Sequence, residues 1–334
     1  MGKIGHSNIS IFIPHMGCPN TCSFCNQRTI SRTASAPAGS QVGEILAQAC
    51  EHLPAGTAEI AFFGGSFSAI PREYMIELLE TAKPFVQSGK VSGLRISTRP
   101  DCIDEEILTI LKEYGVTAIE LGAQSMDDAV LKANERGHSS EDVRKASHMI
   151  KEAGFELGLQ MMTGLYLSTP EKDYETAREI AALGPDTVRI YPVVILKGTK
   201  LGELLQSGEY KPYSFETAAE LCAELLEMFE EKGIRVIKLG LHSSETVEAD
   251  MLGGFYHPAF REICEGILFR RKIEQELTRT KGKRFTVYVS PSAVSKAAGH
   301  KKSNIEYFSE KGISIKIRSD DTLENREISV KKEE

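Results

Sequence analysis

The sequence has 334 residues, of which 41% are hydrophobic and 26% charged, with a net charge of −7. This is the composition of a globular protein and excludes the disordered and fibrous classes. It has no run of eighteen apolar residues, and its first ten residues lack the apolar segment of a secretory signal. We therefore expect a cytoplasmic protein with no membrane-spanning helix and no membrane partner.

Short β-like runs alternate with amphipathic helical patterns over the first 240 residues. The strands are predicted at 10–13, 58–63, 94–97, 118–121, 156–161, 187–191 and 236–239, and the helices at 44–52, 73–85, 105–113, 140–153, 171–183 and 215–232. A strand followed by a helix, repeated about six times, indicates βα units and a parallel sheet. Right-handed crossovers roll such a sheet into a full or partial TIM-like (β/α) barrel, the α/β fold that we expect for residues 1–245.

The pattern changes after residue 245, and we divide the rest into a connecting segment, 246–280, and a small module, 281–334. The connecting segment shows no clear period before a basic helical stretch at 260–279. The module shows the order strand, helix, loop, helix, strand, and then a short strand with a frayed end. It carries twelve Lys or Arg and eight Asp or Glu, a charge of +4 that leaves −11 for the first 280 residues. An anionic partner is therefore expected at the module, and a solvated charged surface is the alternative.

Glycine-rich or polar sequences follow the predicted strands. They are a cysteine loop after the first strand, GGSF after the second, TRPD after the third and GAQS after the fourth. In a (β/α) barrel these positions share one rim, and active sites form on that rim.

Three of the seven cysteines, Cys18, Cys22 and Cys25, lie within eight residues of each other. Four cysteines usually complete an iron–sulfur cluster or a zinc site, but only three are local here. An iron–sulfur cube with three protein ligands keeps one iron open for a substrate or cofactor. The alternative is a zinc site with His6 or His15 as the fourth ligand. The remaining cysteines are expected to pack as small core residues: Cys50, Cys102, Cys222 and Cys264.

The spacing CxxxCxxC, with Phe24 before the last cysteine, resembles the signature of the radical S-adenosylmethionine (SAM) superfamily. The resemblance implies a [4Fe-4S] cluster on Cys18, Cys22 and Cys25, with SAM on the open iron. In that family one electron from the reduced cluster breaks the S–C5′ bond of SAM. The products are methionine and a 5′-deoxyadenosyl radical that abstracts hydrogen from a substrate. An electron donor such as flavodoxin or ferredoxin is implied as well.

The resemblance also implies SAM ligands on the later loops. Gly64, Gly65 and Ser66 are expected to bind SAM. The two glycines allow close backbone approach and are similar to the family's Gly-Gly-Glu motif, although Ser66 and Phe67 replace the usual Glu-Pro. Arg99 is expected either on SAM or in a structural ion pair. Other candidates end the fourth to sixth strands, where polar side chains need a ligand or a polar network: Glu120, Gln124, Gln160 and Tyr191. No residue is assigned an acid or base role.

The run ELGAQSMDDAVLKANERGH, with QMMTGL and RIYPVVILKGTKLGELLQSGEYKPY after it, resembles the radical SAM half of the Elongator complex's catalytic subunit. That enzyme modifies wobble uridines of tRNA, so the resemblance implies an RNA substrate, tRNA or rRNA. The subunit's acetyltransferase domain is not expected, because residues 245–334 are too few for it and lack its pattern. The carboxymethyl-forming reaction of that family is therefore not carried over.

The module contains SAVSKAAGHKKSNIEYF, which resembles the core of a KH domain, where a GxxG loop between two helices clamps a nucleotide backbone. Gly299 matches the first glycine, and Lys302 stands in place of the last. Lys301 and Lys302 beside a helix N-terminus suit an anion such as RNA phosphate. A structural cap on the barrel is the alternative for this module.

Three functions remain open at this point. The first is a radical SAM enzyme that acts on RNA. The second is a radical SAM enzyme that acts on a small metabolite, as porphyrinogen-type relatives do. The third is a non-catalytic iron–sulfur protein that binds RNA.

Overall fold

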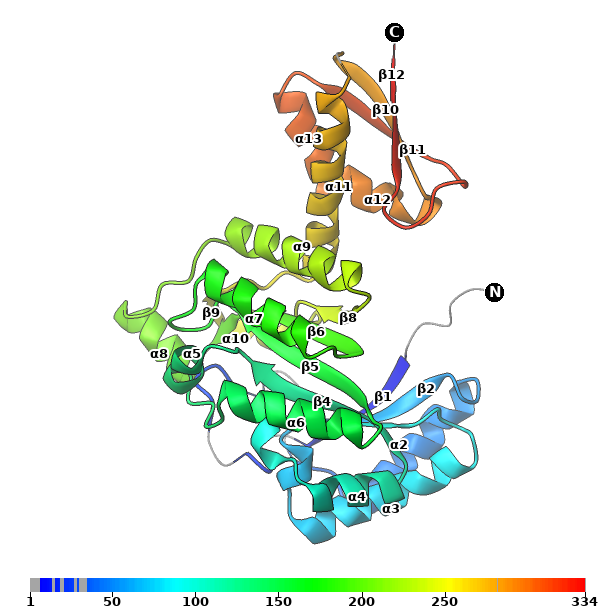
Figure 1. The fold of residues 1–334 in the computed structure, drawn as a ribbon, viewed down its shortest axis with the longest axis vertical. Helices are drawn as coiled ribbons and strands as arrows, with labels where there is room; N and C mark the ends of the chain where they lie inside the picture. Colours follow the sequence, from blue (N-terminus) through cyan, green and yellow to red (C-terminus); the bar gives the residue numbers. More distant parts are fainter. Residues whose placement is uncertain are drawn as a thin grey trace.

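A seven-stranded sheet forms the largest part of the molecule (Figure 1). The computed structural model describes residues 7–13, 16–18, 21–26, 29, 35–280 and 282–333. In chain order the sheet contains β1 (Ser7–Ile13), β2 (Ala58–Gly64), β3 (Leu94–Thr98), β4 (Val116–Gln124), β5 (Glu156–Thr163), β6 (Thr187–Pro192) and β8 (Arg235–Leu239). All neighbouring strands run parallel, and β1 and β8 are the two edges. The predicted partial (β/α) barrel is thus confirmed.

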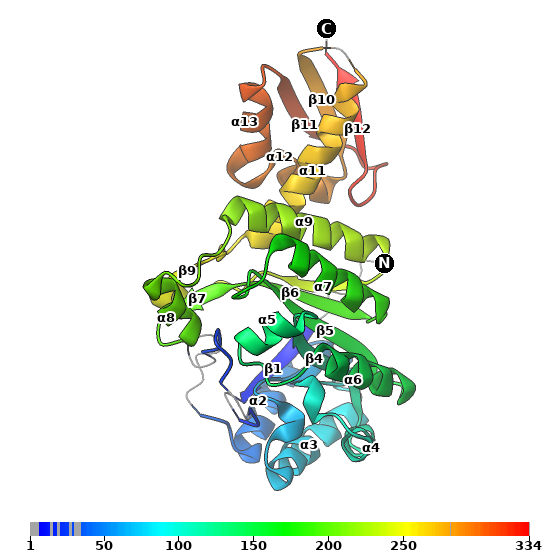
Figure 2. The ribbon, with the colours of Figure 1, turned by 60° about the vertical axis from the view of Figure 1, so that its left-hand side comes forward.

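Helices cover the outer face of this sheet (Figures 1 and 2). All six predicted helices are present, as α2 (Gly39–His52), α3 (Arg72–Gln87), α4 (Glu105–Glu113), α6 (Ser140–Glu152), α7 (Pro170–Ala182) and α9 (Phe215–Glu231). No helix in the described parts of the chain is long and apolar enough to cross a membrane.

Five short elements escape the sequence pattern, because each is too brief to show a period. They are α5 (Asp128–Ala133), α8 (Lys200–Ser207), α10 (Glu245–Asp250), β7 (Val194–Leu196) and β9 (Met251–Gly254). β7 and β9 form a separate antiparallel pair. The segment after residue 242 therefore folds back onto the strand that follows β6.

Alternating side chains give the sheet an apolar outer face and a polar inner face. On β1, Ile9, Ile11 and Ile13 are buried in the core under the helices. Asn8 and Ser10 lie on the opposite face, where they line a cavity. The residues on the inner face include charged groups, which a barrel interior accepts only when they are paired.

A buried ion-pair network supplies this pairing. Arg95 on β3, whose side chain is fully buried, lies 2.8 Å from Glu59, 2.9 Å from Glu156 and 3.5 Å from Glu120. Glu120 also accepts two hydrogen bonds from Arg189, at 2.7 and 2.8 Å. The network links β2, β3, β4, β5 and β6 across the inside of the sheet.

A second core lies in the C-terminal lobe, which α11 (Phe260–Thr278) connects to the barrel (Figures 1 and 2). The lobe contains β10 (Arg284–Val289), α12 (Val294–Ala298), α13 (Ser303–Glu310), β11 (Ser314–Ser319) and β12 (Ile328–Lys332). β11 runs parallel to β10, and β12 runs antiparallel to it. The predicted order of strands and helices is present.

The long helix α11 contributes to both cores. Its Phe260 and Cys264 belong to the barrel core, whereas Phe269 and Ile273 pack in the lobe. Its basic residues Arg270 and Arg271 bind Glu220 of α9. The basic stretch at 260–279 is therefore used in part to fix the lobe helix to the barrel.

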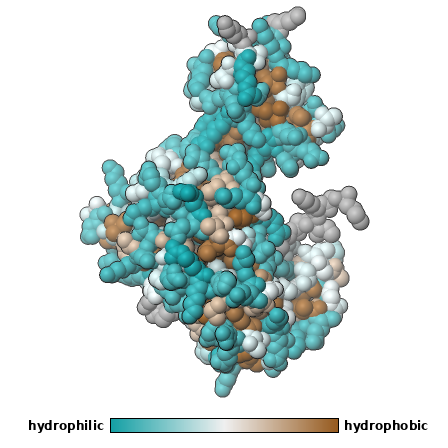
Figure 3. Space-filling model, in the orientation of Figure 1, coloured by the Kyte–Doolittle hydropathy of each residue, from teal (hydrophilic) through white to brown (hydrophobic). Residues whose placement is uncertain are grey.

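Hydrophilic residues cover much of the visible surface, and apolar residues also appear on the lobe (Figure 3).

The four scattered cysteines divide into two groups. Cys222 and Cys264 are buried, as expected for core residues, whereas Cys50 and Cys102 are only half-buried. Cys50 nevertheless packs against the barrel core, as predicted. The prediction of a core position is therefore wrong only for Cys102, which lies in the loop after β3.

Candidate active site

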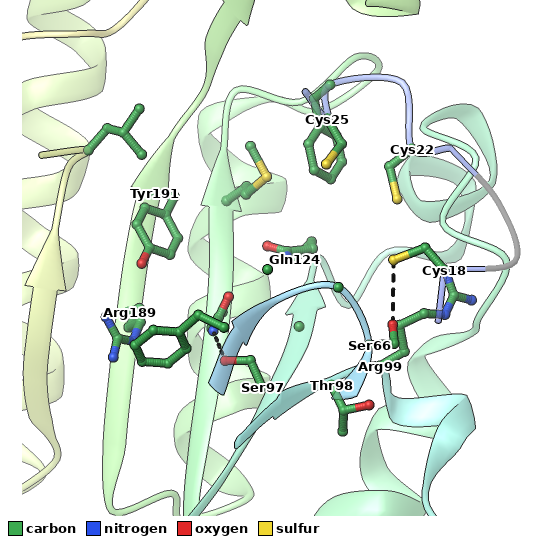
Figure 4. Close-up of a pocket in the computed structure, with 18 of the residues that line it drawn as sticks. Cys18, Cys22, Cys25, Ser66, Ser97, Thr98, Arg99, Gln124, Arg189 and Tyr191 are labelled. Carbon is green, nitrogen blue, oxygen red and sulfur yellow. Dashed lines mark hydrogen bonds between the residues drawn. The ribbon is translucent and has the colours of Figure 1, made fainter. Parts of the chain in front are cut away.

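A cavity of about 430 Å³ lies at the carboxyl ends of the sheet strands (Figure 4). All three cysteines of the loop line it. Seven of the eight residues predicted to bind SAM line it as well: Gly64, Gly65, Ser66, Arg99, Gln124, Gln160 and Tyr191. The structure therefore brings together residues from β1, β2, β4, β5 and β6 and from the loops that follow β1, β2 and β3.

The cysteine loop is fixed by residues that follow α5. Arg136 donates from Nη1 to Cys22 Sγ at 3.1 Å and from Nη2 to the Gly122 carbonyl at 2.6 Å. Ser23 donates from its backbone and its hydroxyl to Asn134, at 3.1 and 2.8 Å. These contacts hold the Cys22 sulfur beside the carboxyl end of β4.

The glycine pair brings the second loop against the first. Gly65 donates from its N–H to the Ile13 carbonyl at 2.7 Å, and Ser66 donates to the Met16 carbonyl at 3.0 Å. A Cβ added to Gly65 would lie 1.9 Å from Met16 O, and Gly64 has a φ of +111°. Glycine is thus required at position 65 so that the loop after β2 can contact the cysteine loop, and Gly65 also lines the cavity.

Gly65→Ala is expected to displace the cysteine loop, because the added methyl overlaps a backbone oxygen that a side-chain rotation cannot move. We expect less iron per chain after anaerobic reconstitution and a loss of about 1–3 kcal/mol in unfolding free energy. Both are measurable, by iron analysis and by urea unfolding. Gly43→Ala is the control, since its Cβ would meet Thr81 Cγ2 at 3.5 Å, an ordinary contact. If Gly65→Ala keeps the iron content and stability of the wild type, the close contact between Gly65 and the Met16 carbonyl is contradicted.

Four cavity residues each have a buried polar atom without a partner among the described residues: Asn8 Oδ1, Arg99 Nη1, Gln124 Oε1 and Arg136 Nε. Two of these residues, Gln124 and Arg99, are predicted SAM ligands. Gln124 follows a register shift in β4 and has a φ of +66°, an uncommon conformation that clusters at functional sites. Arg99 binds Asp101 through two hydrogen bonds, at 2.9 and 2.7 Å, and keeps Nη1 unused. A ligand that carries both an anionic group and an N–H donor would satisfy both atoms.

Glu120 is the predicted SAM ligand that the cavity lining does not include. Its side chain is 1% exposed and accepts bonds from Arg189 and from Gln160, the latter at 2.9 Å. The polar network described above uses this carboxylate, and a direct contact between Glu120 and SAM stays a prediction. Gln160, which lines the cavity, is held by Glu120 and by Ser97 at 3.3 Å.

His138 lies behind the cysteine loop and is buried. Its Nε2 is 3.2 Å from the Ala123 carbonyl, and burial together with the Arg136 charge lowers its pKa to about 4. The imidazole is therefore neutral at pH 7 and donates its Nε2–H to that carbonyl.

His138→Gln is expected to reduce the acid sensitivity of the fold. A histidine whose pKa falls from 6.5 to about 4 on folding contributes stability above pH 6.5 that is lost as pH falls through 4. Between pH 7 and pH 4 the unfolding free energy of the wild type should fall by about 2–3 kcal/mol more than that of the variant, as measured by urea unfolding. The exposed His148 provides the control, and His148→Gln should keep the wild-type profile. Identical profiles for His138→Gln and wild type would contradict the burial argument.

Sequence reasoning missed several cavity residues, among them Asn8, Ser10, Lys238 and His242. A signal existed for the first two, because the run SNISIF alternates polar and apolar residues and so gives the first strand a polar face. Lys238 stands within an otherwise apolar strand, VIKL, which is a weaker sign of the same kind.

The donor set fits a cluster better than a single ion. Among the described residues, no three His, Cys, Asp or Glu side chains surround one point closely enough to hold a metal ion. The three thiols line the cavity from separate positions, and a [4Fe-4S] cube bonds each thiolate through a different iron. His6 and His15, on which the zinc alternative depends, lie outside the described residues.

Comparisons with known proteins agree with this geometry. A sequence model of the radical SAM superfamily matches residues 12–183, and one of the radical SAM C-terminal domain matches residues 185–270. The tRNA uridine(34) acetyltransferase of Methanocaldococcus infernus is 35% identical over 189 residues, which are 50% of this chain and 35% of that protein. Human Elongator complex protein 3 is 33% identical over 190 residues, 51% of this chain and 35% of that one. The chain thus spans about a third of the length of these relatives.

A solved structure shares the fold. The archaeal Elp3 of Methanocaldococcus infernus with an N-terminal deletion superposes with a TM-score of 0.63 and 22% identity, covering 84% of this chain and 64% of that one. The family model covers more than half of the chain, and it includes the cysteine loop and the loops that face it. The non-catalytic alternative is thereby set aside, and the chain belongs to the radical SAM superfamily of enzymes.

Proposed function

We propose that this enzyme cleaves SAM reductively at a [4Fe-4S] cluster held by Cys18, Cys22 and Cys25, and that it modifies RNA, tRNA or rRNA. One observation carries the catalytic part. The three thiols line the same cavity as the unpartnered buried atoms of Gln124 and Arg99. The RNA part is supported by relatives that are named as tRNA uridine(34) acetyltransferases.

The protein groups around the cavity suit the two ends of SAM. In this proposal the Arg99 guanidinium binds the carboxylate of SAM, and Gln124 Oε1 together with the backbone of Gly64 and Gly65 accepts from its ammonium group. Gln160, Tyr191 and Ser66 line the remaining wall. When bound, the reduced cluster supplies the electron that divides SAM into methionine and a 5′-deoxyadenosyl radical. A flavodoxin or ferredoxin is proposed as the electron source.

Arg136 has a positioning role in this proposal. Its bond to Cys22 Sγ and its bond to the Gly122 carbonyl tie the cysteine loop to the end of β4, the strand that also carries Gln124. Because a hydrogen bond to a cluster-binding sulfur shifts the reduction potential, this arginine also tunes the cluster.

The loop between α12 and α13 is the proposed contact with RNA. Lys301 and Lys302 are exposed and have left-handed φ angles of 53° and 68°. They lie directly before α13, whose first N–H groups suit a phosphate. His300 in the same loop stacks edge-on against His257, with ring centroids 4.9 Å apart. His257 follows β9, which pairs with β7, and β7 contributes Val194 and Leu196 to the cavity wall. An RNA strand bound by the loop between α12 and α13 would therefore be linked to the cavity wall through His257, β9 and β7.

The catalytic proposal is tested by an anaerobic assay of the reconstituted, reduced protein with SAM, with and without total cellular RNA. We expect 5′-deoxyadenosine in both, more of it with RNA, and a modified nucleoside detectable by mass spectrometry. No 5′-deoxyadenosine under either condition would overturn the proposal. Product that RNA does not stimulate would favour the small-metabolite alternative.

The RNA contact is tested by Lys301→Asn combined with Lys302→Asn. Asparagine tolerates the left-handed backbone of both positions, so that two charges are removed without added strain. We expect weaker tRNA binding and a salt dependence whose slope falls by about 1–2. Lys232→Asn, at an exposed position after α9, is the matched control. Unchanged affinity and slope in the double variant would leave the module as a structural cap.

A further inference from the structure

The cavity has a second end, across from the cysteines, that the proposed cluster and SAM contacts do not use. Figure 4 shows Arg189 on this side, across the cavity from the cysteine loop. The wall includes Asn8 and Ser10 of β1 and Lys238 of β8, the two edge strands of the sheet. Arg189 on β6 is the register partner of Lys238. This end therefore lies where the partial barrel is open.

Lys238 stands in a cationic environment. It is half-buried, and no residue within the described ranges forms an ion pair with its ammonium group. Burial lowers its pKa, and the charged neighbours that act on it, Arg189 and Arg261, lower it further. Arg189 is bound to Glu120 and Arg261 to Glu265, so neither carboxylate compensates Lys238. An ammonium group in such a place is costly unless an anion binds beside it.

Hydrogen-bonding groups accompany this charge. The side-chain oxygen of Asn8 is buried and lacks a partner in the part of the chain that the structure describes. Because an amide can turn, it offers either an N–H or an oxygen to a ligand. Ser10 lines the same wall and is exposed, so its hydroxyl is accessible from solvent. The wall thus offers an ammonium from one edge strand and an amide and a hydroxyl from the other, groups that bind a carboxylate or a phosphate.

We propose that Lys238, with Asn8 and Ser10, binds an anionic group of the second substrate and holds that substrate across the cavity from the cysteine loop. The inference rests on the proposed function, because it takes the cavity to be the place where substrate meets SAM. A phosphate of the RNA and the carboxylate of a small co-substrate share this chemistry. Either one would bring its reactive carbon between the edge strands and the SAM ligands.

The test measures how fast an amine-reactive ester labels Lys238, by peptide mass spectrometry of the cluster-loaded protein. Inorganic phosphate, acetate and a short RNA oligonucleotide are the probes, at constant ionic strength made up with chloride. An anion at about ten times its dissociation constant should slow labelling of Lys238 about tenfold, since about a tenth of the site stays free. Labelling of the exposed Lys232 should not change. Protection by phosphate and the oligonucleotide identifies a phosphate site, and protection by acetate alone identifies a carboxylate site.

No protection by any of the three probes would overturn the inference. It would leave the proposed SAM cleavage intact, because labelling does not depend on turnover. A second measurement uses Lys238→Met, whose melting temperature should not rise with the protecting anion, whereas the wild type and Lys232→Met should both respond. An equal response in Lys238→Met would assign the anion to another site and would also overturn the inference.

Discussion

Replacing any one of Cys18, Cys22 and Cys25 with alanine is expected to abolish 5′-deoxyadenosine formation. In the proposed site the three thiolates would together hold the cluster, so the loss of one ligand would leave it open to solvent and to loss of iron. All three side chains line the cavity, and no other cysteine lines it in the part of the chain that the structure describes. We expect less than half of the wild-type iron and sulfide per chain, the loss of the visible absorption of the cluster, and product at background level.

Cys50→Ala provides the control for these variants. Cys50 is a half-buried residue of α2 and does not line the cavity. It should keep the iron content and the 5′-deoxyadenosine yield of the wild type. A Cys25→Ala protein with four irons per chain and wild-type activity would remove Cys25 from the ligand set.

The barrel could be predicted because its signals are local and repeated. Each strand run is bounded by turn residues, and each helix has a 3.6-residue pattern, so seven strands and six helices are identified from the sequence. The strand order follows from right-handed crossovers between parallel neighbours. The pair β7 and β9 could not be predicted, because its strands have three and four residues and their paired residues are 55 or more positions apart in the chain.

The candidate site could be predicted at the level of loops but not of atoms. Spacing indicated that the cysteines, glycines, Arg99 and Gln124 would share one rim, and they line one cavity. The sequence does not show that Glu120 is taken by Arg189, since that pair is formed across two strands and separated by 69 residues. Nor does it show that Gly65 is needed against Met16, because that contact depends on how two loops pack.

Arg95→Met is expected to cost about 3–5 kcal/mol of unfolding free energy, the range for breaking a buried ion pair by removing one partner. The arginine is fully buried, and its three nitrogens face Glu59, Glu120 and Glu156 at 2.8, 3.5 and 2.9 Å. Burial alone would lower its pKa, but the hydrogen bond with Glu156 and the attraction of Glu59 and Glu120 raise it. Without Arg95, Glu59 loses its 2.8 Å ion pair, and Glu120 keeps Arg189 and Gln160 as its partners. Urea unfolding measures the loss, which is a large part of the 5–15 kcal/mol typical of a domain.

An exposed arginine and a double variant test whether this cost comes from burial. Arg178 pairs with Glu175 at 2.9 Å, but both side chains are 60% exposed, so Arg178→Met should cost less than about 1 kcal/mol. Combining Arg95→Met with Glu59→Gln should recover part of the loss, because the neutral amide removes one of the uncompensated charges. A cost below about 1 kcal/mol for Arg95→Met, equal to that of Arg178→Met, would show that water enters the inner face of the sheet. In that case the polar interior, including the end of the cavity beside Lys238, would be solvated. Water would then stabilise the Lys238 ammonium group, which would not need an anionic ligand.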